Sequence, residues 1–162
     1  MFKPNVTMAC VVHCKGKFLF VEEIEYGKRT LNQPAGHLEQ GETLLEGASR
    51  ELFEETGIRA EMASLVKIYQ WQAPRTQTEY LRFLFAVELE EWLEPNPQDA
   101  DITQALWLSE AEFQHYIQQE GQCERSPLVV QSLKDYLSGE RYPLSLLNAF
   151  EWKQREANNA AI

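Results

Sequence analysis

The chain has 162 residues, of which 44% are hydrophobic and 25% charged, with a net charge of −10 at pH 7. These values suit one globular domain and argue against a nucleic-acid polymer as the main partner, because such binding needs a basic face. No apolar run approaches the roughly 18 residues of a membrane span. Three cysteines and no evident signal peptide favour a reducing cytoplasm. We therefore expect a cytoplasmic monomer without a membrane partner.

The first part of the chain predicts strands joined by short turns. Val6–Cys14 is rich in β-branched and small apolar residues, which is typical of a buried strand. A second strand follows at Lys17–Glu23, and then a turn around Gly27. A short extended segment, Leu31–Gly36, leads into the middle of the chain, because Pro34 favours an extended residue before it.

The middle of the chain predicts one helix over Leu44–Thr56. Thr43 is placed to cap its N-terminus, with Glu46 three residues later to complete a capping box. Gly57 stands where a glycine C-cap belongs. Both ends of this helix are therefore specified locally.

One face of this helix is strongly acidic. Glu51, Glu54 and Glu55 recur at helical spacing, so their carboxylates gather on one patch, where like charges repel. Arg50 relieves part of that repulsion, and the remainder favours a bound cation. Clustered carboxylates suit Mg²⁺ or Mn²⁺, and Mg²⁺ is commonly bound by protein carboxylates and substrate phosphates together. The sequence thus predicts a metal site and a small phosphorylated substrate.

The second half predicts two more strands and then helices. A strand is expected at Arg59–Trp71, a polar loop at Gln72–Thr78 and a strong strand at Tyr80–Leu89. An acidic loop follows at 90–101. The remaining expected segments are a lead-in at Ile102–Leu108, a helix at Ala111–Gln119 capped by Ser109, a linker at Gly121–Arg125, a helix from Ser126 to about Leu137, and a short helix at Pro143–Trp152. Together these elements indicate one α/β domain over 1–152, with helices from about 109 and a frayed tail at 153–162.

The segment 36–58 resembles the Nudix box at every defined position. The matching residues are Gly36, Glu42, Arg50-Glu51-Leu52, Glu54-Glu55 and Gly57-Ile58. The resemblance implies an α/β/α sandwich around a mixed β-sheet. It also implies hydrolysis of organic diphosphates with Mg²⁺, for which Mn²⁺ can substitute.

By motif position, the resemblance assigns roles to the box residues. Glu51, Glu54 and Glu55 would hold the metal, with the backbone carbonyl of Ala35 as a further ligand. Arg50 would be the remaining catalytic residue, because it would orient the acidic side chains. Glu42 would help to orient them.

Segments outside the box resemble one branch of bacterial phosphatases in this family. They include MFKPNVTMACVVH, NQPAGHLE, LRFLFA and RSPLV. That likeness implies hydrolysis of nucleoside di- and triphosphates, or of the pyrophosphates of thiamine and its hydroxymethylpyrimidine precursor. Inorganic phosphate is the expected product, formed by in-line attack of a metal-activated water.

Further residues outside the box are candidates for the same site. Asp101 is a candidate for the catalytic acid or base from the acidic loop, where some relatives use a glutamate; Asp99 lies in the same loop. For substrate binding we select Arg82 as a phosphate contact, Trp71 as a surface on which a ring stacks, and Gln33 before the box.

Two alternative functions remain open. Pro74 lies about 16 residues past the box, as in some ADP-ribose pyrophosphatases of the family, so that activity is the first alternative. A non-catalytic binding module with the same fold is the second, and the intact box carboxylates argue against it.

Overall fold

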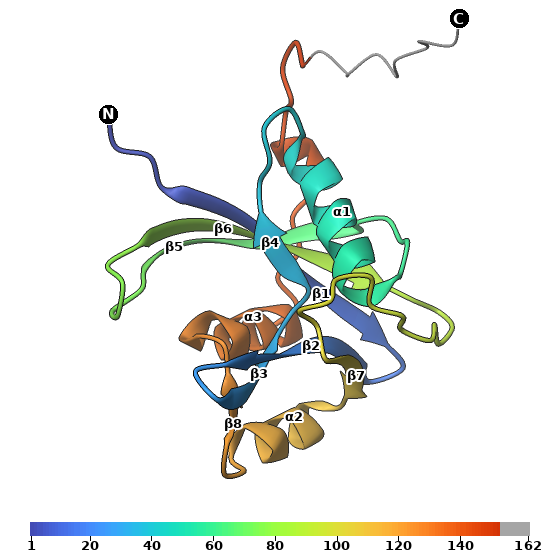
Figure 1. Ribbon diagram of the computed structural model, residues 1–162. Coiled ribbons are helices and arrows are strands. Elements are labelled where there is room, and N and C mark those ends of the chain that lie inside the picture. Colours follow the sequence, from blue (N-terminus) through green and yellow to red (C-terminus); the bar gives the residue numbers. More distant parts are fainter. Residues whose placement is uncertain (153–162) are drawn as a thin grey trace, which may run out of the picture.

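The computed structural model describes residues 1–152 as a mixed β-sheet with α-helices on both sides (Figure 1). The strands are β1 (Asn5–Cys14), β2 (Lys17–Glu25), β3 (Lys28–Asn32), β4 (Ala35–His37), β5 (Ser64–Gln72), β6 (Glu79–Glu88), β7 (Gln104–Leu108) and β8 (Gln122–Glu124). The helices are α1 (Leu44–Thr56), α2 (Glu110–Ile117) and α3 (Pro127–Leu137), followed by one 3₁₀ turn, η1 (Leu144–Leu146). None of these helices is long and apolar enough to cross a membrane.

The sheet forks along one edge of β1. The main strand order is β5-β6-β1-β2-β3-β8, with β1–β6 and β3–β8 parallel and the other pairs antiparallel. β4 pairs with β1 at Thr7–Ala9, whereas β2 pairs with β1 further along at His13–Cys14. Because β4 and β2 use different parts of the same edge, β3 and β4 diverge after the Gln33–Pro34 connection.

Two hydrophobic cores lie on opposite faces of the sheet. Alternate residues of β1 point to opposite sides, so Ala9 and Val11 enter one core while Met8, Cys10 and Val12 enter the other. The first core is closed by α2 and α3, the second by α1 through Ala48 and Leu52. This arrangement confirms the predicted α/β class with a mixed sheet.

Helix α1 has the bounds and caps that the sequence predicts. Thr43 and Glu46 form the capping box, and Gly57 adopts a left-handed conformation with φ 71°. The acidic loop between β6 and β7 is attached to the C-terminal end of α1. The backbone N–H of Asn96 donates to the carbonyl of Thr56 at 2.7 Å, and that of Asp99 donates to the carbonyl of Glu54 at 2.8 Å. The loop therefore lies beside the predicted catalytic helix.

Several expected boundaries were wrong in the second half of the chain. Strand β5 begins at Ser64 rather than Arg59. The predicted linker Gly121–Arg125 contains β8, which pairs with β3, and the predicted lead-in Ile102–Leu108 contains β7, which pairs with β2. These short strands exist because a partner strand satisfies their backbone groups, and a segment of three to five residues shows no such partner in its own sequence.

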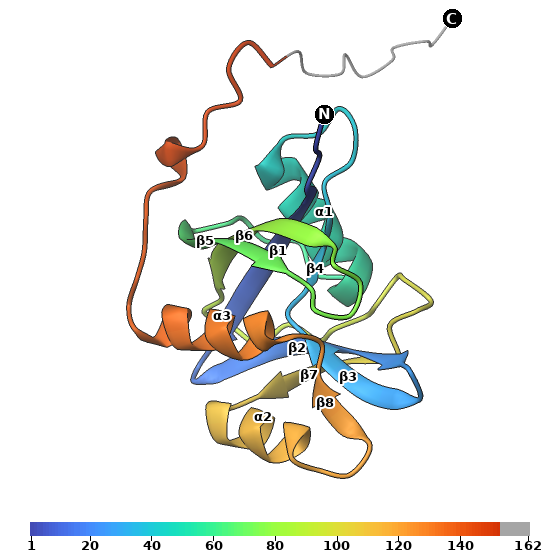
Figure 2. The ribbon, with the colours of Figure 1, turned by 90° about the vertical axis from the view of Figure 1, so that its left-hand side faces the viewer.

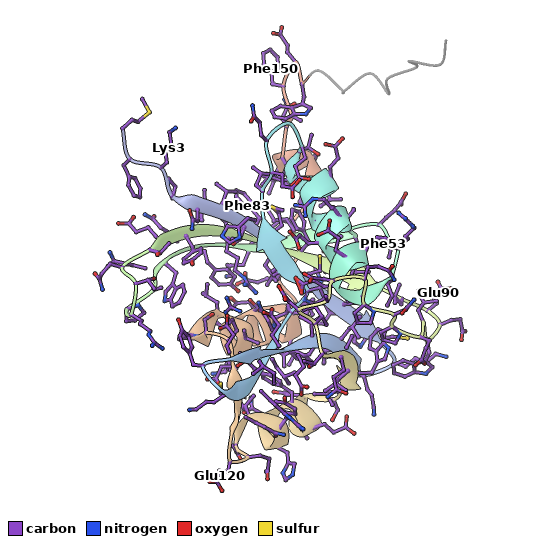
Figure 3. The ribbon with its side chains drawn as sticks, in the orientation of Figure 1. Lys3, Phe53, Phe83, Glu90, Glu120 and Phe150 are labelled. Carbon is purple, nitrogen blue, oxygen red and sulfur yellow. The ribbon has the colours of Figure 1, made fainter. Side chains whose placement is uncertain are left out.

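The expected helix at Pro143–Trp152 was also wrong, since only η1 forms there. Tyr142 makes a β-bridge with Leu65 on the edge strand β5, and Leu144 and Leu147 pack against the core under α1. The segment after α3 thus passes around the sheet edge to the opposite face (Figure 2). Phe150 lies at the end of this segment far from α3 (Figure 3). The predicted tail, 153–162, falls outside the described residues.

Candidate active site

Arg50 is the centre of an ion-pair network on α1. Its Nε and Nη2 donate to the two oxygens of Glu42 at 2.9 and 2.8 Å, a two-pronged contact. Its Nη1 donates to Glu51 at 2.8 Å and to Glu54 at 3.2 Å, and Nη2 also donates to the carbonyl of His37 at 2.9 Å. One guanidinium therefore sets the direction of three box carboxylates and ties them to β4.

The Glu51 carboxylate is set against the backbone of Gly36. A Cβ placed on Gly36 would come within 2.0 Å of Glu51 Cδ, so only glycine leaves room for this side chain. Burial raises the pKa of Glu51, the hydrogen bond and charge of Arg50 lower it, and the charges of Glu54 and Glu42 raise it again, with a net increase. The ionised form of Glu51 is therefore less favourable in this site than it would be in water.

Glu55 is the most buried of the box carboxylates, with 5% of its surface exposed. Its Oε1 accepts a hydrogen bond from the backbone N–H of Ala35 at 3.1 Å, while its buried Oε2 has no partner in the described residues. Burial raises the Glu55 pKa to about 9; the Ala35 N–H opposes this increase, and the charges of Glu51, Glu23 and Asp99 add to it. A buried carboxylate oxygen without a donor is a position that a cation would stabilise.

The box residues fit a divalent metal ion by their chemistry. Within residues 1–152, no group of three or more His, Cys, Asp and Glu side chains has the arrangement of a metal site. Glu51 and Glu54 turn toward Arg50 instead, and Glu55 turns toward β4. Even so, the unpaired Oε2 of Glu55 and the Glu51 carboxylate lying against Gly36 supply the oxygen ligands that Mg²⁺ and Mn²⁺ prefer.

Acidic residues outside the box approach Glu55 from two elements. Asp99, in the loop anchored on α1, and Glu23, on β2, both raise the Glu55 pKa through their charge. Asp101 is exposed, and its N–H donates to Asp99 Oδ1 at 2.9 Å. The charge of Asp99 therefore acts on Glu55, and Asp99 also accepts a hydrogen bond from the backbone of Asp101. The sequence did not single out Glu23, because an acidic residue on a strand shows no sign of which helix it will face.

Gln33 and Arg82 form a buried pair beneath the fork of the sheet. Gln33 Nε2 donates to the carbonyl of Val129 on α3 at 2.8 Å, and Gln33 Oε1 accepts from Arg82 Nη2 at 2.9 Å. Arg82 is 7% exposed, its Nε is buried without a partner in the described residues, and burial lowers its pKa to about 10. Arg82 is thus a buried cation, not a residue of the outer surface, while Gln33 holds it in place.

A cleft of about 490 Å³ opens beside the fork. Ala35 and Gly36, which contact the box glutamates, line it, and Arg82 lines it from β6. Trp71 and Tyr80 form an aromatic wall, with ring centroids 5.8 Å apart. The structure therefore brings four of the predicted positions together: Ala35, Arg82, Trp71 and, behind Arg82, Gln33.

The cleft is also lined by residues that the sequence did not single out. Asn32 at the end of β3 and Arg125 just before α3 both line the cleft. Arg125 makes an ion pair with Glu25 at 2.7 Å, and Arg75 lies over the ring of Tyr26 at 3.8 Å. These contacts join segments far apart in the chain, so no local pattern could have revealed them.

Comparison with known proteins assigns the family. The NUDIX domain model matches residues 1–127. Phosphatase NudJ of Escherichia coli (strain K12) and that of Shigella flexneri are each 53% identical over 152 residues, covering 94% of this chain and 95% of theirs. A NUDIX hydrolase from Nitrosomonas europaea of known structure superposes with a TM-score of 0.81 at 42% identity, covering 91% of this chain and 98% of that one.

The chain therefore belongs to the Nudix hydrolase family. It is similar over nearly its whole length to the phosphatase NudJ of enteric bacteria. Nudix hydrolases generally use divalent metal ions such as Mg²⁺.

Proposed function

We propose that this protein hydrolyses phosphoanhydride bonds in nucleoside di- and triphosphates, and in thiamine or hydroxymethylpyrimidine pyrophosphate. The observation that carries the proposal is a cleft lined by Ala35 and Gly36, which are themselves in contact with Glu55 and Glu51. A diphosphate bound there would lie against the box while its organic group extends along the cleft. The likeness to a phosphatase, NudJ, supports the same reaction.

Glu51, Glu54, Glu55 and the carbonyl of Ala35 would hold Mg²⁺ or Mn²⁺. Such an ion, when bound, would neutralise phosphate oxygens and lower the pKa of a water molecule that it binds. The protein's own contribution is orientation: Arg50 directs Glu51 and Glu54, and the Ala35 N–H directs Glu55. These contacts hold the carboxylates in the metal-free protein, where they turn toward Arg50 and β4 rather than toward one another.

In the proposed reaction a water oxygen bonds to phosphorus as the anhydride P–O bond opposite it breaks. The water's proton passes to a nearby carboxylate. We propose a residue of the acidic loop for this role, Asp101 or Asp99; the effect of the Asp99 charge on Glu55 favours Asp99. Inorganic phosphate leaves as one product.

The cleft's other residues suit the remaining parts of such a substrate. Arg82 presents a buried positive charge with an unused Nε donor, which complements a phosphate oxygen. Trp71, already stacked on Tyr80, offers a flat apolar face for a heteroaromatic ring. Gln33 acts through Arg82, because it contacts Arg82 and not the cleft.

We also propose that the catalytic domain spans 1–152 and acts as a monomer in the cytoplasm. Leu144 and Leu147 pack under α1, so the segment after α3 belongs to the domain core. All three cysteines, Cys10, Cys14 and Cys123, are unpaired, as is usual for a reducing compartment.

A substrate panel tests the proposal, with inorganic phosphate measured for every substrate except ADP-ribose, whose hydrolysis gives AMP and ribose 5-phosphate and is followed by the AMP formed. The panel contains nucleoside di- and triphosphates, thiamine pyrophosphate and ADP-ribose, each with Mg²⁺ and with excess EDTA. We expect inorganic phosphate from the nucleotides or thiamine pyrophosphate with Mg²⁺, and a loss of at least about 100-fold in EDTA. Turnover of ADP-ribose alone would replace the proposal with the ADP-ribose pyrophosphatase alternative. No turnover of any substrate, with Mg²⁺ binding retained, would indicate a binding module.

A further inference from the structure

Asn32 presents a buried hydrogen-bond acceptor to the cleft. Asn32 is one of the residues that line the cleft, and its Oδ1 is buried without a hydrogen-bond partner in the described residues. Buried polar atoms in folded proteins are nearly always paired, so an unpaired one beside a ligand cleft calls for an explanation. A donor group on the ligand would supply the missing partner.

The backbone holds Asn32 rigidly in this position. Asn32 is the last residue of β3, where it is paired with Val21 of β2. Its two chain neighbours are deeply buried, Leu31 at 0% and Gln33 at 2% exposure, and Gln33 is also hydrogen-bonded to α3. The unpaired oxygen therefore belongs to a fixed part of the cleft wall, and a fixed acceptor discriminates between ligands better than a mobile one.

The position of Asn32 and the acceptor character of its carbonyl oxygen indicate which part of the substrate it would contact. A carbonyl oxygen does not accept from phosphate oxygens, and the positive charges of Arg82, Arg75 and Arg125 line the same cleft to serve those groups. A ring stacked on Trp71 presents its edge, not its face, to the other walls. An acceptor at such an edge fits an exocyclic amino group.

We propose that Asn32 is a specificity-determining residue that accepts a hydrogen bond from an exocyclic amino group of the substrate's heteroaromatic ring. The inference rests on the proposed hydrolase function and names its substrate class. Cytosine, adenine and aminopyrimidine rings are favoured over the matching keto rings. A keto ring directs an oxygen at Oδ1 and leaves the acceptor unpaired.

Matched substrate pairs test this inference. CDP and UDP carry an amino and a keto group at the same ring carbon, and the adjacent ring nitrogen is an acceptor in CDP and an N–H donor in UDP; ADP and IDP differ in the same way. For the wild type with Mg²⁺ we expect kcat/KM to be about fivefold higher for the amino member of each pair. In Asn32→Leu, which keeps the size and removes the acceptor, we expect the ratio to fall within about twofold of one, with tripolyphosphate hydrolysis nearly unchanged. Asn32→Asp keeps an acceptor oxygen and should retain the preference, even if its added charge lowers all rates.

Three outcomes would overturn the inference. One is equal kcat/KM within each pair for the wild type, and another is a preference for the keto member. The third is an unchanged preference in Asn32→Leu. A CDP and dCDP pair provides a separate test. If that pair shows that Asn32 contacts the ribose hydroxyl instead of the ring, the inference is also overturned. If no nucleotide, thiamine pyrophosphate or tripolyphosphate is hydrolysed, the proposed function itself has failed, so the two failures are distinguishable.

Discussion

The carboxylate of Glu51 occupies the space that a side chain on Gly36 would need. A Cβ on Gly36 would lie 2.0 Å from Glu51 Cδ and 2.1 Å from Glu51 Oε1. The glycine at the start of the box, on β4, therefore leaves room for a carboxylate that α1 carries. The requirement is for room, because the backbone of Gly36 lies outside the left-handed region that favours glycine.

Gly36→Ala should displace Glu51 without unfolding the protein. The added methyl group forces the carboxylate out of its position, so we expect kcat to fall about 100-fold while the melting temperature measured in EDTA changes little. A double-mutant cycle with Glu51→Gln provides the control. If the glycine acts through Glu51, Gly36→Ala should cost little further activity in the Glu51→Gln background. Additive losses would show that the two residues act separately.

Glu54→Gln and Glu55→Gln should each leave the fold intact and lower kcat about 100-fold or more, a loss of roughly 2.7 kcal/mol in barrier lowering. Each change keeps the side chain's size and removes one negative charge from the proposed metal site. Steady-state kinetics with Mg²⁺ measures the loss. Glu61→Gln, on the exposed loop after α1, is the matched control and should retain wild-type rates. Near wild-type kcat for either box variant would contradict the assigned role.

The stability of the metal-free protein should fall as pH rises, because burial raises the Glu55 pKa from 4.5 to about 9. The folded state then binds the proton more tightly than the unfolded state. The contribution of Glu55 to the free energy of unfolding is fully present below pH 4.5 and is lost as pH rises toward 9, with a slope of at most about 1.4 kcal/mol per pH unit.

Melting curves in EDTA at several pH values, compared between the wild type and Glu55→Gln, measure this contribution. The variant should melt higher than the wild type at about pH 8, and the two should converge toward about pH 5. If the melting temperatures of the two proteins change with pH in parallel, the fold does not disfavour the ionised form of Glu55.

Trp71→Ala should raise KM for ring-bearing substrates more than it affects tripolyphosphate. The indole lines the cleft and stacks on Tyr80, so it offers its face to a ring and nothing specific to a bare phosphate chain. We expect about a tenfold rise in KM for nucleoside diphosphates. Trp92→Ala is the matched control, because Trp92 packs on Trp107 and does not line the cleft. Equal losses on both substrate classes would make Trp71 a packing residue.

Much of the box helix was predictable from the sequence because its determinants are local. Thr43, Glu46 and Gly57 satisfy the ends of α1 within a few residues of chain, so both bounds were correct. The acidic face follows from helical spacing alone. The strands β1, β2 and β6 were recognisable for a similar reason, since long apolar runs are typical of buried strands.

Only the tertiary structure decided which other residues share the site. Arg82, Trp71 and Asn32 line one cleft because β4 and β2 pair with different parts of β1, and that fork depends on pairing between distant segments. The same holds for Asp99, which is placed near Glu55 by hydrogen bonds from its loop to the end of α1. By itself the sequence determined the helix that carries the carboxylates, because its capping and spacing are encoded over neighbouring residues. The fold determined the walls around it, because burial and strand pairing depend on contacts that no local pattern contains.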